Sequence, residues 1–469
     1  MRPTPHELLS EAWRSLGGDP ALTASAAFTG RPDTLPARLP VTEFAQAVAA
    51  AAGLAGAELA AARAGSHPDL AAVTVDSEAA AIAFTSERHL RLDGNPVGGM
   101  DPLSKFFACA DGVVRLHANY PHHRAALFAA LGIEDEPVDP EEAVAERLVM
   151  LPVADVEERV REHGGLAFAA RTLDAWRAHP HGAGLADLLP VAMRRTGAET
   201  PRRLGPTPSD GPLLPAAGVR VLDFTRVIAG PVGTRTLALL GADVLRVDSP
   251  DLPELPGQHL DTGLGKRSAL LDLRSPDGLA RLDELLADAD VVVSGYRPGA
   301  LTRFGLDPDA LLARHPGLVV ATLSAWGPGP WSEYRGFDSL VQAPTGIAAI
   351  EADGDLRPAA LPAQALDHGT GYLLAAGVLR ALTERQHDGR GTHLELALAR
   401  TAAWLVRHFD PDEHLPAFPR RVRSAGHLSQ ATMAGARLDY ALPPFHLEGG
   451  PTDWAAGPVG WGSSPAVWQ

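Results

Sequence analysis

The stretch GVRVLDFTRVIAGPVGTRTLALLGADVLRVDSP, residues 218–250, decides the fold. Val219–Phe224 is a short apolar run typical of a buried strand. Pro231 opens a helical pattern that ends before Gly241, as expected from the preference for proline at the first turn of a helix and glycine just past its end. Asp243–Val247 predicts a second strand. Strand, helix and strand at this spacing predict a parallel βαβ unit.

The same alternation continues along the chain. We predict helices at Ser275–Ala287 and Asp307–Arg314, and strands at Asp290–Ser294 and Leu318–Leu323. Ser275 is expected to cap the first of these helices, because its hydroxyl can accept from a free backbone N–H. The fold class is therefore α/β, and ligands of such sheets bind beyond the carboxyl ends of the strands.

The residues before this unit have a different pattern. A proline-dense linker is predicted at Pro201–Gly218. Upstream of it we predict an alanine-rich helix, a strand entering a helix, a hairpin and two further helices, at Val41–Arg63, Ala72–Phe84, Phe106–Leu116, Val153–His163 and Leu166–His179. The tail, Phe409–Gln469, has little periodicity and predicts an extended arm whose tryptophans pack on the body or on a partner.

One part of the first half looks like a copy of a later part. Gly371–Leu405 runs from an alanine-rich helix through a strand into another helix, and Val41–Phe84 resembles a degenerate repeat of it. Shared low complexity would produce the same likeness, so both interpretations remain open.

Composition limits the function. The chain has 469 residues, 45% of them hydrophobic, and 41 basic residues against 57 acidic ones, so nonspecific nucleic-acid binding is disfavoured. We expect no stretch to approach the ~20 apolar residues that span a bilayer. One cysteine, Cys109, excludes an intrachain disulfide framework. A cytoplasmic protein is the expectation.

Several polar residues stand where a site could form. The loop Thr225–Pro231 enters a helix, where free N–H groups can hold an anion, but it lacks the GxGxxG fingerprint of dinucleotide binding. Asp248 ends a strand, as a ribose-binding acid or a turn residue would. Asp338 can cap a helix, and Asp367 or Thr370 can cap the next one. From the residues alone, the capping roles are favoured.

Residues 218–405 as a whole resemble the class III CoA-transferases of the CaiB/BaiF type, which include formyl-CoA transferase, carnitine CoA-transferase and the related α-methylacyl-CoA racemase. The opening stretch is one matching motif. The others are GKRSALLDLRSPDG (265–278), ADVVVSGYRPGALTRFGL (289–306), RGFDSLVQAPTG (335–346) and ALDHGTGYLLAAGVLRALTERQHDGRGTHLELAL (365–398). They occur in the order of that family.

The resemblance implies a Rossmann-like large domain with a parallel sheet and a smaller α+β domain. In the family the small domain follows the large one, whereas here its counterpart comes first, so the chain is rearranged or partly duplicated. The expected divisions are an alanine-rich segment with a degenerate repeat of 367–405, a small domain, a linker, a CoA-binding catalytic domain and a C-terminal arm, at 1–95, 96–200, 201–218, 219–405 and 406–469. Leu442–His446 resembles the return strand of the family.

By the resemblance, Asp367 is the catalytic nucleophile. Its carboxylate would attack a thioester carbonyl, and the CoA thiolate would return to give an aspartyl-CoA thioester. Aspartate suits this role because it is normally ionised at neutral pH. Gly369 and Gly371 permit close approach of the backbone, and N–H groups at this helix start could stabilise an oxyanion.

Three further positions are implied to line the substrate pocket. Phe337 stands where related racemases carry a histidine base, and phenylalanine has no proton to move, so transfer is favoured over racemisation. Asp338 and Gln342 would line the same pocket. Ile228 replaces a glutamine of formyl-CoA transferase, which argues against oxalate or formate as substrate.

CoA itself is implied as the substrate carrier. The positions that match CoA contacts are Arg226, Val227, Ala229, Leu271, Arg274, Tyr296, Ala300 and Arg303, with Lys266 and Arg267 as weaker candidates. The arginines would hold phosphates. No metal site is expected, because the histidines, including the adjacent His122 and His123, do not show a ligand spacing.

The sequence therefore predicts an acyl-CoA:carboxylate CoA-transferase. The resemblance implies a homodimer, interlocked as in the family. Its partners would be an acyl-CoA and a carboxylic acid acceptor, without nucleic acid or membrane. Three alternatives remain open: an acyl-CoA racemase or isomerase, a non-catalytic CoA-binding homologue, and a nucleotide-dependent oxidoreductase.

Overall fold

A computed structural model of the chain describes residues 2–65, 70–134, 137–196, 200, 202–352, 357–412 and 422–469. Its largest sheet has seven strands in the order β11-β10-β9-β12-β13-β14-β8. Six of these strands are parallel, and β8 pairs antiparallel with β14 at one edge. In sheet order, the strands span Arg267–Leu270, Asp243–Asp248, Arg220–Phe224, Val291–Ser294, Val319–Ser324, Gly391–Ala397 and Val191–Thr196.

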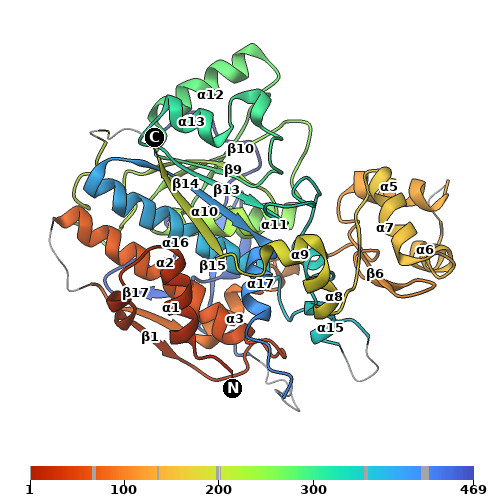
Figure 1. Cartoon of the computed structure of the whole chain (residues 1–469). Helices are drawn as coiled ribbons and strands as arrows, with labels where there is room; N and C mark the ends of the chain where they lie inside the picture. The colour runs from red at the N-terminus through yellow and green to blue at the C-terminus, as the bar shows by residue number, and fades with distance from the viewer. Residues whose placement is uncertain are drawn as a thin grey trace.

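Helices cover both faces of this sheet (Figure 1). Alternate residues of a strand point to opposite faces, so Val221 joins the core beside α10 and α16 while Leu222 joins the core beneath α12 and α13. The helices and the 3-10 turn η2 of this part are α10, α11, α12, η2, α13, α14, α15, α16 and α17, at Ala229–Leu239, Pro256–Thr262, Pro276–Asp288, Thr302–Phe304, Pro308–Arg314, Asp338–Gln342, Ile347–Ile350, Ala365–Asp388 and Leu398–Val406. The predicted parallel α/β unit is confirmed.

The predicted cap at Ser275 is confirmed, because its Oγ accepts from Gly278 N at 3.0 Å. The capping roles considered for three other residues are wrong. Phe337 holds the N-cap position of α14, and Gln364 holds that of α16. Asp338 and Asp367 lie inside their helices, which leaves both carboxylates available for other contacts.

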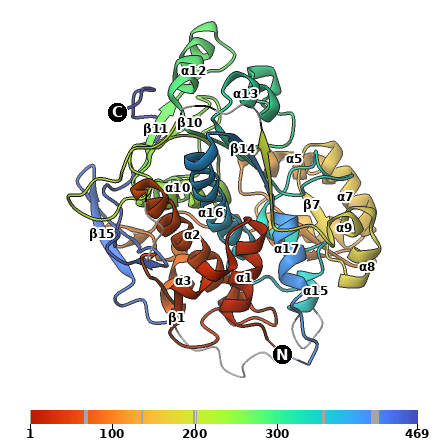
Figure 2. The ribbon, with the colours of Figure 1, turned by 60° about the vertical axis from the view of Figure 1, so that its left-hand side comes forward.

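The N-terminal helix α2 (Val41–Ala64) lies in the core, packed on α16 and on α1 (Pro5–Ser15) (Figure 2). By length and composition it is the one helix among the described residues that could cross a membrane, which corrects the expectation that no stretch approaches that length. In this fold 89% of its most apolar window is buried. Its alanines allow the backbones of α2 and α16 to approach closely.

A small sheet, β1-β2-β17, flanks α2. The strand β2 (Val73–Asp76) pairs in parallel with β1 (Ala26–Thr29) and antiparallel with β17 (His446–Leu447), which follows the predicted return segment. Helix α3 (Ser77–Ala83) continues directly from β2, as predicted, and Asp76 caps it by accepting from Glu78 N and Ala79 N. The 3-10 turn η1 (Pro20–Ser25) precedes β1.

Residues 106–178 form most of a lobe beside the main body (Figure 1). Its sheet, β5-β6-β7, includes the predicted hairpin as β5 (Phe106–Ala108) and β6 (Val113–Leu116). The predicted helix at Leu166–His179 is wrong in its first half, because β7 (Ala167–Ala169) pairs with β6 and is buried, and α8 begins only at Leu173. The helices α5 to α9 span Pro121–Leu131, Pro140–Leu148, Val153–Glu162, Leu173–Ala178 and Pro180–Leu185.

The tail is more regular than the predicted extended arm. Strands β15 (Leu428–Met433) and β16 (Ala436–Ala441) form a hairpin, extended by β3 (Arg91–Leu92) and β4 (Asn95–Pro96). Its two turn residues, Ala434 and Gly435, both have positive φ, as a tight hairpin turn requires. Residues 413–421 of the predicted arm lie outside the described residues.

The tail tryptophans pack on the body of the same chain. Trp454 Nε1 donates to the carbonyl of Arg235 at 2.8 Å, and Trp468 Nε1 donates to that of Leu285 at 3.1 Å. The predicted linker also lies against the body. The guanidinium of Arg63, near the end of α2, donates to the carbonyls of Pro215 and Ala217 at 2.6 and 2.9 Å. Pro201 lies outside the described residues.

Candidate functional site

A cavity of about 400 Å³ opens beside the first turn of α16. Asp367, the third residue of that helix, lines it together with Phe337, Val227 and Ile228. Another part of the cavity wall comes from the N-terminal half of the chain, including α4 (Ser86–His89). Its residues are Glu87, Arg88, Arg91, Pro96, Val97, Gly98, Gly99, Met100, His117 and Asn119. One chain therefore supplies both parts of the wall.

Asp338 holds the backbone of Asp367 in place by a hydrogen bond. The Asp338 Oδ2 accepts from the backbone N of Asp367 at 2.9 Å, and its Oδ1 accepts from the Gln342 side chain. Gln342 in turn accepts from Leu361 N at 2.8 Å. Asp338 and Gln342 are fully buried, so the structure places both behind the cavity wall and in contact with the helix that carries Asp367.

The electrostatics of this pair differ from those of an exposed aspartate. Burial raises the pKa of Asp338 to about 6. Burial also raises the pKa of Asp367 well above its usual range, and the nearby carboxylates of Asp338 and Glu87 raise it further. The environment of Asp367 thus differs from that of the ordinary, ionised aspartate on which the sequence argument rested. Once ionised, the poorly solvated carboxylate is a strong nucleophile.

Glu87 was not identified from the sequence. It lies on α4, lines the cavity, and has its Oε2 3.8 Å from His368 Nε2. Burial opposes ionisation of Glu87, but the neighbouring His368 lowers the pKa of this carboxyl group below its usual value. His368 stacks on Phe84 with ring centroids 5.3 Å apart. A carboxylate thus stands beside Asp367, but no sequence pattern around Glu87 distinguishes it from an ordinary surface acid.

The two glycines after Asp367 serve helix packing. A Cβ on Gly369 would meet the ring of Phe44 in α2 at 2.2 Å. A Cβ on Gly371 would meet the carbonyl of Ala229 in α10 at 2.5 Å. The close backbone approach expected at these two glycines is therefore the approach of α2 and α10 to α16. It holds the start of α16 in place beside the cavity.

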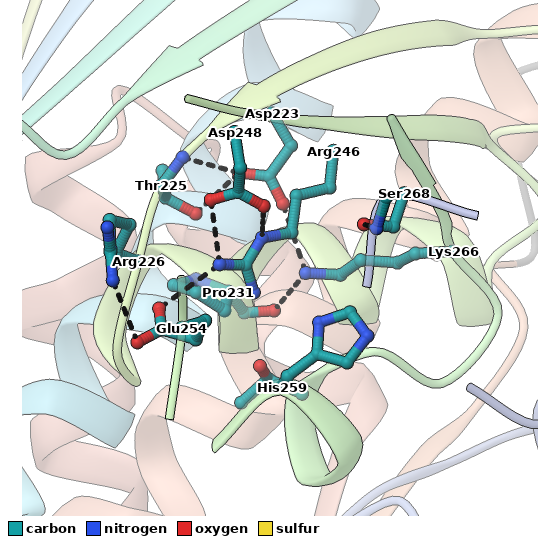
Figure 3. A network of polar contacts seen from close by, with 12 residues as sticks. Asp223, Thr225, Arg226, Pro231, Arg246, Asp248, Glu254, His259, Lys266 and Ser268 are labelled. Atoms are coloured by element: carbon teal, nitrogen blue, oxygen red, sulfur yellow. Dashed lines mark hydrogen bonds and ion pairs between the residues drawn. The ribbon is translucent and has the colours of Figure 1, made fainter. Parts of the chain in front are cut away.

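The loop after β9 is held by a buried acid (Figure 3). Glu254 accepts from Val227 N at 3.0 Å and from the Tyr120 hydroxyl at 2.7 Å, and it pairs with Arg226 at 3.3 Å. Val227 has φ 69°, which is strained for a β-branched residue. The neighbouring arginines lower the pKa of Glu254 to about 2, so this acid remains charged and holds the loop.

Beneath the loop lies a buried ionic network (Figure 3). Lys266 Nζ contacts Asp223 Oδ2 at 3.1 Å and donates to the carbonyl of Pro231 at 2.9 Å, and burial lowers its pKa to about 8. Arg246 binds Asp248 through two hydrogen bonds of 2.7 and 3.0 Å. Lys266 and Asp248 thus serve this network and are enclosed away from solvent.

The predicted CoA contacts are divided between several places. Val227 lines the Asp367 cavity, while Ala229 is buried at the start of α10. Arg226 donates to the carbonyls of Leu252 and Pro253 at 2.8 and 2.9 Å. Tyr296 lines a second cavity, of about 460 Å³, at the ends of β12 and β13.

The remaining predicted contacts lie on or near the surface. Arg274 is exposed and pairs with Asp272 at 2.8 Å and with Asp251. Arg303 lies over the Phe304 ring at 4.6 Å. Leu271 packs at the edge of the core beneath α12, and Ala300 is half-buried. Arg267 pairs with Asp243 at 2.7 Å.

Two arginines that the sequence prediction omitted line accessible space. Arg297 and Arg335 border a third cavity, of about 280 Å³, and Arg297 also borders the second one. Within the described residues neither makes an ion pair: Arg297 donates to the carbonyl of Glu333 at 2.9 Å and Arg335 to that of Gly164 at 3.5 Å. Burial and the charge of Arg297 lower the pKa of Arg335, so an anion would be favoured here.

A histidine from another part of the chain lies beside Phe337, the position at which related racemases carry a histidine base. His117 stacks flat on Phe337, with ring centroids 4.0 Å apart and an interplanar angle of 3°. It lines the same cavity as Asp367. The absence of a base at Phe337 therefore does not by itself exclude proton transfer in this cavity. Burial lowers the pKa of His117 to about 3, which makes its imidazole a weak base.

Ligand-type atoms of Asp76, Glu78 and His427 come within 4.8 Å of one another in the described part of the chain. The carboxylates of this group already have partners. Asp76 accepts from Glu78 N at 2.8 Å, and Glu78 pairs with Arg31 and accepts from Arg423 N at 3.2 Å. These contacts describe a cap and an ion pair, and we assign the group no metal.

Comparison with known proteins adds the following. Residues 216–433 match the family model described as CoA-transferase family III. The chain is 36% identical over 193 residues to a formyl-CoA:oxalate CoA-transferase of Bradyrhizobium sp. (strain ORS 278), covering 39% of this chain and 45% of that protein. It is 34% identical over 212 residues to a probable fatty acyl-CoA transferase of Mycobacterium tuberculosis, covering 42% and 54%. The resemblance to class III CoA-transferases is confirmed for this segment.

Solved structures match a similar share of the chain. A crystal structure of a hypothetical protein from Mycobacterium tuberculosis is 34% identical, with a TM-score of 0.40, and covers 42% of this chain and 58% of that one. A CaiB/BaiF family protein from Brucella suis is 26% identical, with a TM-score of 0.39, and covers 48% and 65%. The chain spans about half the length of the curated relatives it matches.

Proposed function

We propose that this protein is an acyl-CoA:carboxylate CoA-transferase in which Asp367 is the nucleophile. The observation that carries the proposal is the placement of this carboxylate at the wall of a cavity of about 400 Å³. The family match and the relatives named as CoA-transferases support the reaction class. The strand order, third-second-first-fourth-fifth-sixth within the parallel set, supports a Rossmann-like large domain.

The proposed chemistry uses the burial of Asp367. Its carboxylate attacks the thioester carbonyl and the CoA thiolate leaves. The thiolate then attacks the aspartyl carbonyl of the mixed anhydride, which gives aspartyl-CoA and releases the donor acid as its carboxylate. The acceptor carboxylate attacks aspartyl-CoA, and the returning thiolate cleaves the second anhydride at the acceptor carbonyl, which gives the new CoA thioester and restores Asp367. Asp338 holds the backbone N of Asp367 at 2.9 Å and so limits movement of the nucleophile. The apolar part of the wall, including Ile228 and Phe337, excludes water from intermediates that hydrolyse readily.

The phosphates of CoA need cations, and Arg297 with Arg335 are the best placed. Arg335 lies two residues before Phe337 of the Asp367 cavity, and Arg297 borders both other cavities. Arg335→Ala should weaken binding of CoA thioesters about tenfold, and the loss should disappear with a pantetheine thioester that lacks the nucleotide. Arg303→Ala is the matched comparison for the position predicted from sequence. Equal losses with both thioesters would contradict a phosphate contact.

Mass spectrometry after incubation with mixed acyl-CoAs tests the proposed function. A CoA adduct on Asp367 that hydroxylamine removes supports it and identifies the donor. Absence of any adduct, together with retained CoA binding, would favour a non-catalytic CoA-binding protein. For the acyl-CoA racemase or isomerase alternative, deuterium entry at the α-carbon in deuterated water is the test.

We also propose a cytoplasmic homodimer, because the first half of the chain lacks counterparts of the motifs VLDFTRVIAGP (221–231) and LDHGTG (366–371) and so does not supply a second large domain. The complete cavity wall in one chain and the packing of Trp454 and Trp468 on their own body support the competing monomer, in which one chain imitates two subunits. Light scattering at low concentration separates them. A mass of about 98 kDa, twice the chain mass of 49.2 kDa, supports the dimer. A stable mass of 49.2 kDa would refute it.

A further inference from the structure

Two polar side chains follow strand β6 into the Asp367 cavity. His117 and Asn119 are separated by one residue and both line this cavity. Side chains two residues apart on an extended chain lie on the same face, so the two present their polar groups to the same space. Neither was assigned a role by the motifs of the large domain.

Asn119 presents an N–H donor. Its Oδ1 accepts from Asp101 N at 2.9 Å and from Ser104 Oγ at 2.7 Å. These two bonds fix the orientation of the amide, because the opposite orientation would set donors against donors. Its Nδ2 has no hydrogen-bond partner in the described part of the chain and remains available on the cavity side.

His117 presents a neutral ring held by stacking. The face of Phe337 fixes its plane at a centroid distance of 4.0 Å. Its ring Nδ1 is enclosed without a partner among the described residues. Burial keeps the pKa of this imidazole near 3, so the ring carries one N–H and no charge at neutral pH. A neutral imidazole can donate a hydrogen bond to a developing oxyanion.

The backbone N–H groups at the start of α16 already donate hydrogen bonds to other groups of the protein. The backbone N of Asp367 donates to Asp338 Oδ2 at 2.9 Å, and that of Leu366 also bonds the Asp338 carboxyl group. The backbone N of His368 donates to the carbonyl of Gln364 at 3.0 Å. An oxyanion formed at Asp367 therefore needs donors from elsewhere in the wall.

We propose that His117 and Asn119 donate the hydrogen bonds that hold the thioester carbonyl oxygen during attack by Asp367, an inference that rests on the proposed function. A bond forms between an Asp367 carboxylate oxygen and the carbonyl carbon, and the π electrons move onto the carbonyl oxygen. Their return expels the CoA thiolate. No proton is transferred in this step, so uncharged donors suffice.

Kinetics of matched variants tests the role of each donor. His117→Phe, which keeps an aromatic ring for stacking, and Asn119→Asp, which replaces an N–H donor by a carboxylate oxygen, should each lower kcat about 10²–10³-fold with little change in KM. His117→Gln keeps a donor and should recover at least tenfold of that loss. His163→Gln, at an exposed helix end in the same lobe, is the control. Loss in His117→Gln equal to that in His117→Phe would overturn the donor role and indicate a base.

A spectroscopic readout separates this proposal from the function on which it rests. In an Asp367→Asn background, bound acyl-CoA labelled with ¹³C at the thioester carbonyl should show a lowered infrared stretching frequency. Adding His117→Phe should reverse part of that shift, whereas His117→Gln should preserve it. If the wild type forms an Asp367 adduct but the shift is unaffected by His117→Phe, the donor role is wrong. If the wild type forms no adduct, the proposed function itself fails.

Discussion

Two helices of 24 residues, α2 and α16, pack against each other and begin two units of the same design. Each ends at a glycine with positive φ and is followed by a strand that leads directly into another helix. The strand β2 pairs in parallel with β1 and antiparallel with β17, just as β14 pairs with β13 and β8. This shared order favours duplication over chance likeness of alanine-rich helices.

The two units differ at the third residue of the first helix. In α16 this residue is Asp367, which lines a cavity and has the carboxylates of Asp338 and Glu87 nearby. In α2 it is Glu43, whose Oε2 lies 3.8 Å from Arg2 Nε. Both units thus carry an acid at the same helical position. The neighbours, rather than the acid, make one of them a candidate nucleophile.

The largest expected difference between the units is catalytic. Asp367→Asn should lower transfer on the order of 10³-fold or more, because an amide cannot form the aspartyl-CoA thioester, while CoA binding should persist. Glu43→Gln should leave kcat within about twofold. Steady-state transfer assays and titration calorimetry with CoA measure the two effects. Comparable loss of activity in both variants would contradict the assignment of Asp367.

The second difference concerns the contact between the helices. Gly369→Ala should lower the free energy of unfolding by about 1–3 kcal/mol, because its Cβ would overlap the Phe44 ring at 2.2 Å. Gly377→Ala, later in the same helix, meets the flexible ends of Leu394 at 3.3 Å and of Leu16 at 3.5 Å. Its change should stay within about 1 kcal/mol, since higher helix propensity offsets slight crowding. Urea denaturation compares them, and equal effects would argue against tight packing at Gly369.

The third prediction concerns the pH dependence that Asp338 imposes. Removing its charge in Asp338→Asn should lower the pKa of Asp367, shifting the acidic limb of the kcat/KM profile down by roughly one unit. Glu43→Gln should leave that limb in place. An unshifted profile in Asp338→Asn would show that the two carboxyl groups are not coupled.

The same pair predicts the direction of a stability change. The folded protein keeps the Asp338 proton between pH 3.8, the usual pKa, and about pH 6. At Asp338 the folded state therefore binds more protons than the unfolded state in that window, so the contribution of this group to the free energy of unfolding should fall as the pH rises through it. Urea denaturation at a series of pH values should show the stability of Asp338→Asn rising relative to that of the wild type across the window. A difference between the two proteins that stays constant with pH would contradict the raised pKa.

The smallest expected effect lies at Glu43. Its contact with Arg2 at 3.8 Å is long, and glutamine keeps the shape and an acceptor oxygen of glutamate, so Glu43→Gln should cost less than about 1 kcal/mol of unfolding free energy. Part of that cost should disappear in 1 M salt, because salt screens the attraction between the two charges. A larger, salt-independent loss would indicate that Glu43 has a structural role comparable to that of Asp338.

Local patterns predicted the parallel unit well because each element there satisfies its own rules. The strand β12 is a run of valines, and α12 begins at a serine whose hydroxyl caps it. The strand β7 was missed because its Ala-Phe-Ala sequence has no strong strand signal and is extended only by pairing with β6. The hairpin at Ala434 was missed because alanine rarely adopts the positive φ that this turn requires.

Only the part of the candidate site that belongs to the parallel unit could be predicted from the sequence. The motifs around Asp367 and Phe337 lie in one stretch of family resemblance, so Asp367, Phe337 and Ile228 could be proposed together and do share a cavity. The partners Glu87, His117 and Asn119 lie more than 200 residues before Phe337 and Asp367 in the sequence. No periodicity links residues so distant, because only packing of the first half on α16 brings them there.

The sequence by itself determined the alternating strands and helices of the parallel unit. These features depend on interactions between residues close along the chain. Tertiary structure alone decided which acid is buried, which glycine admits a neighbouring helix, and which arginines stay free of carboxylates. Desolvation and charge depend on every group within a few ångströms, and most of those groups come from distant parts of the chain.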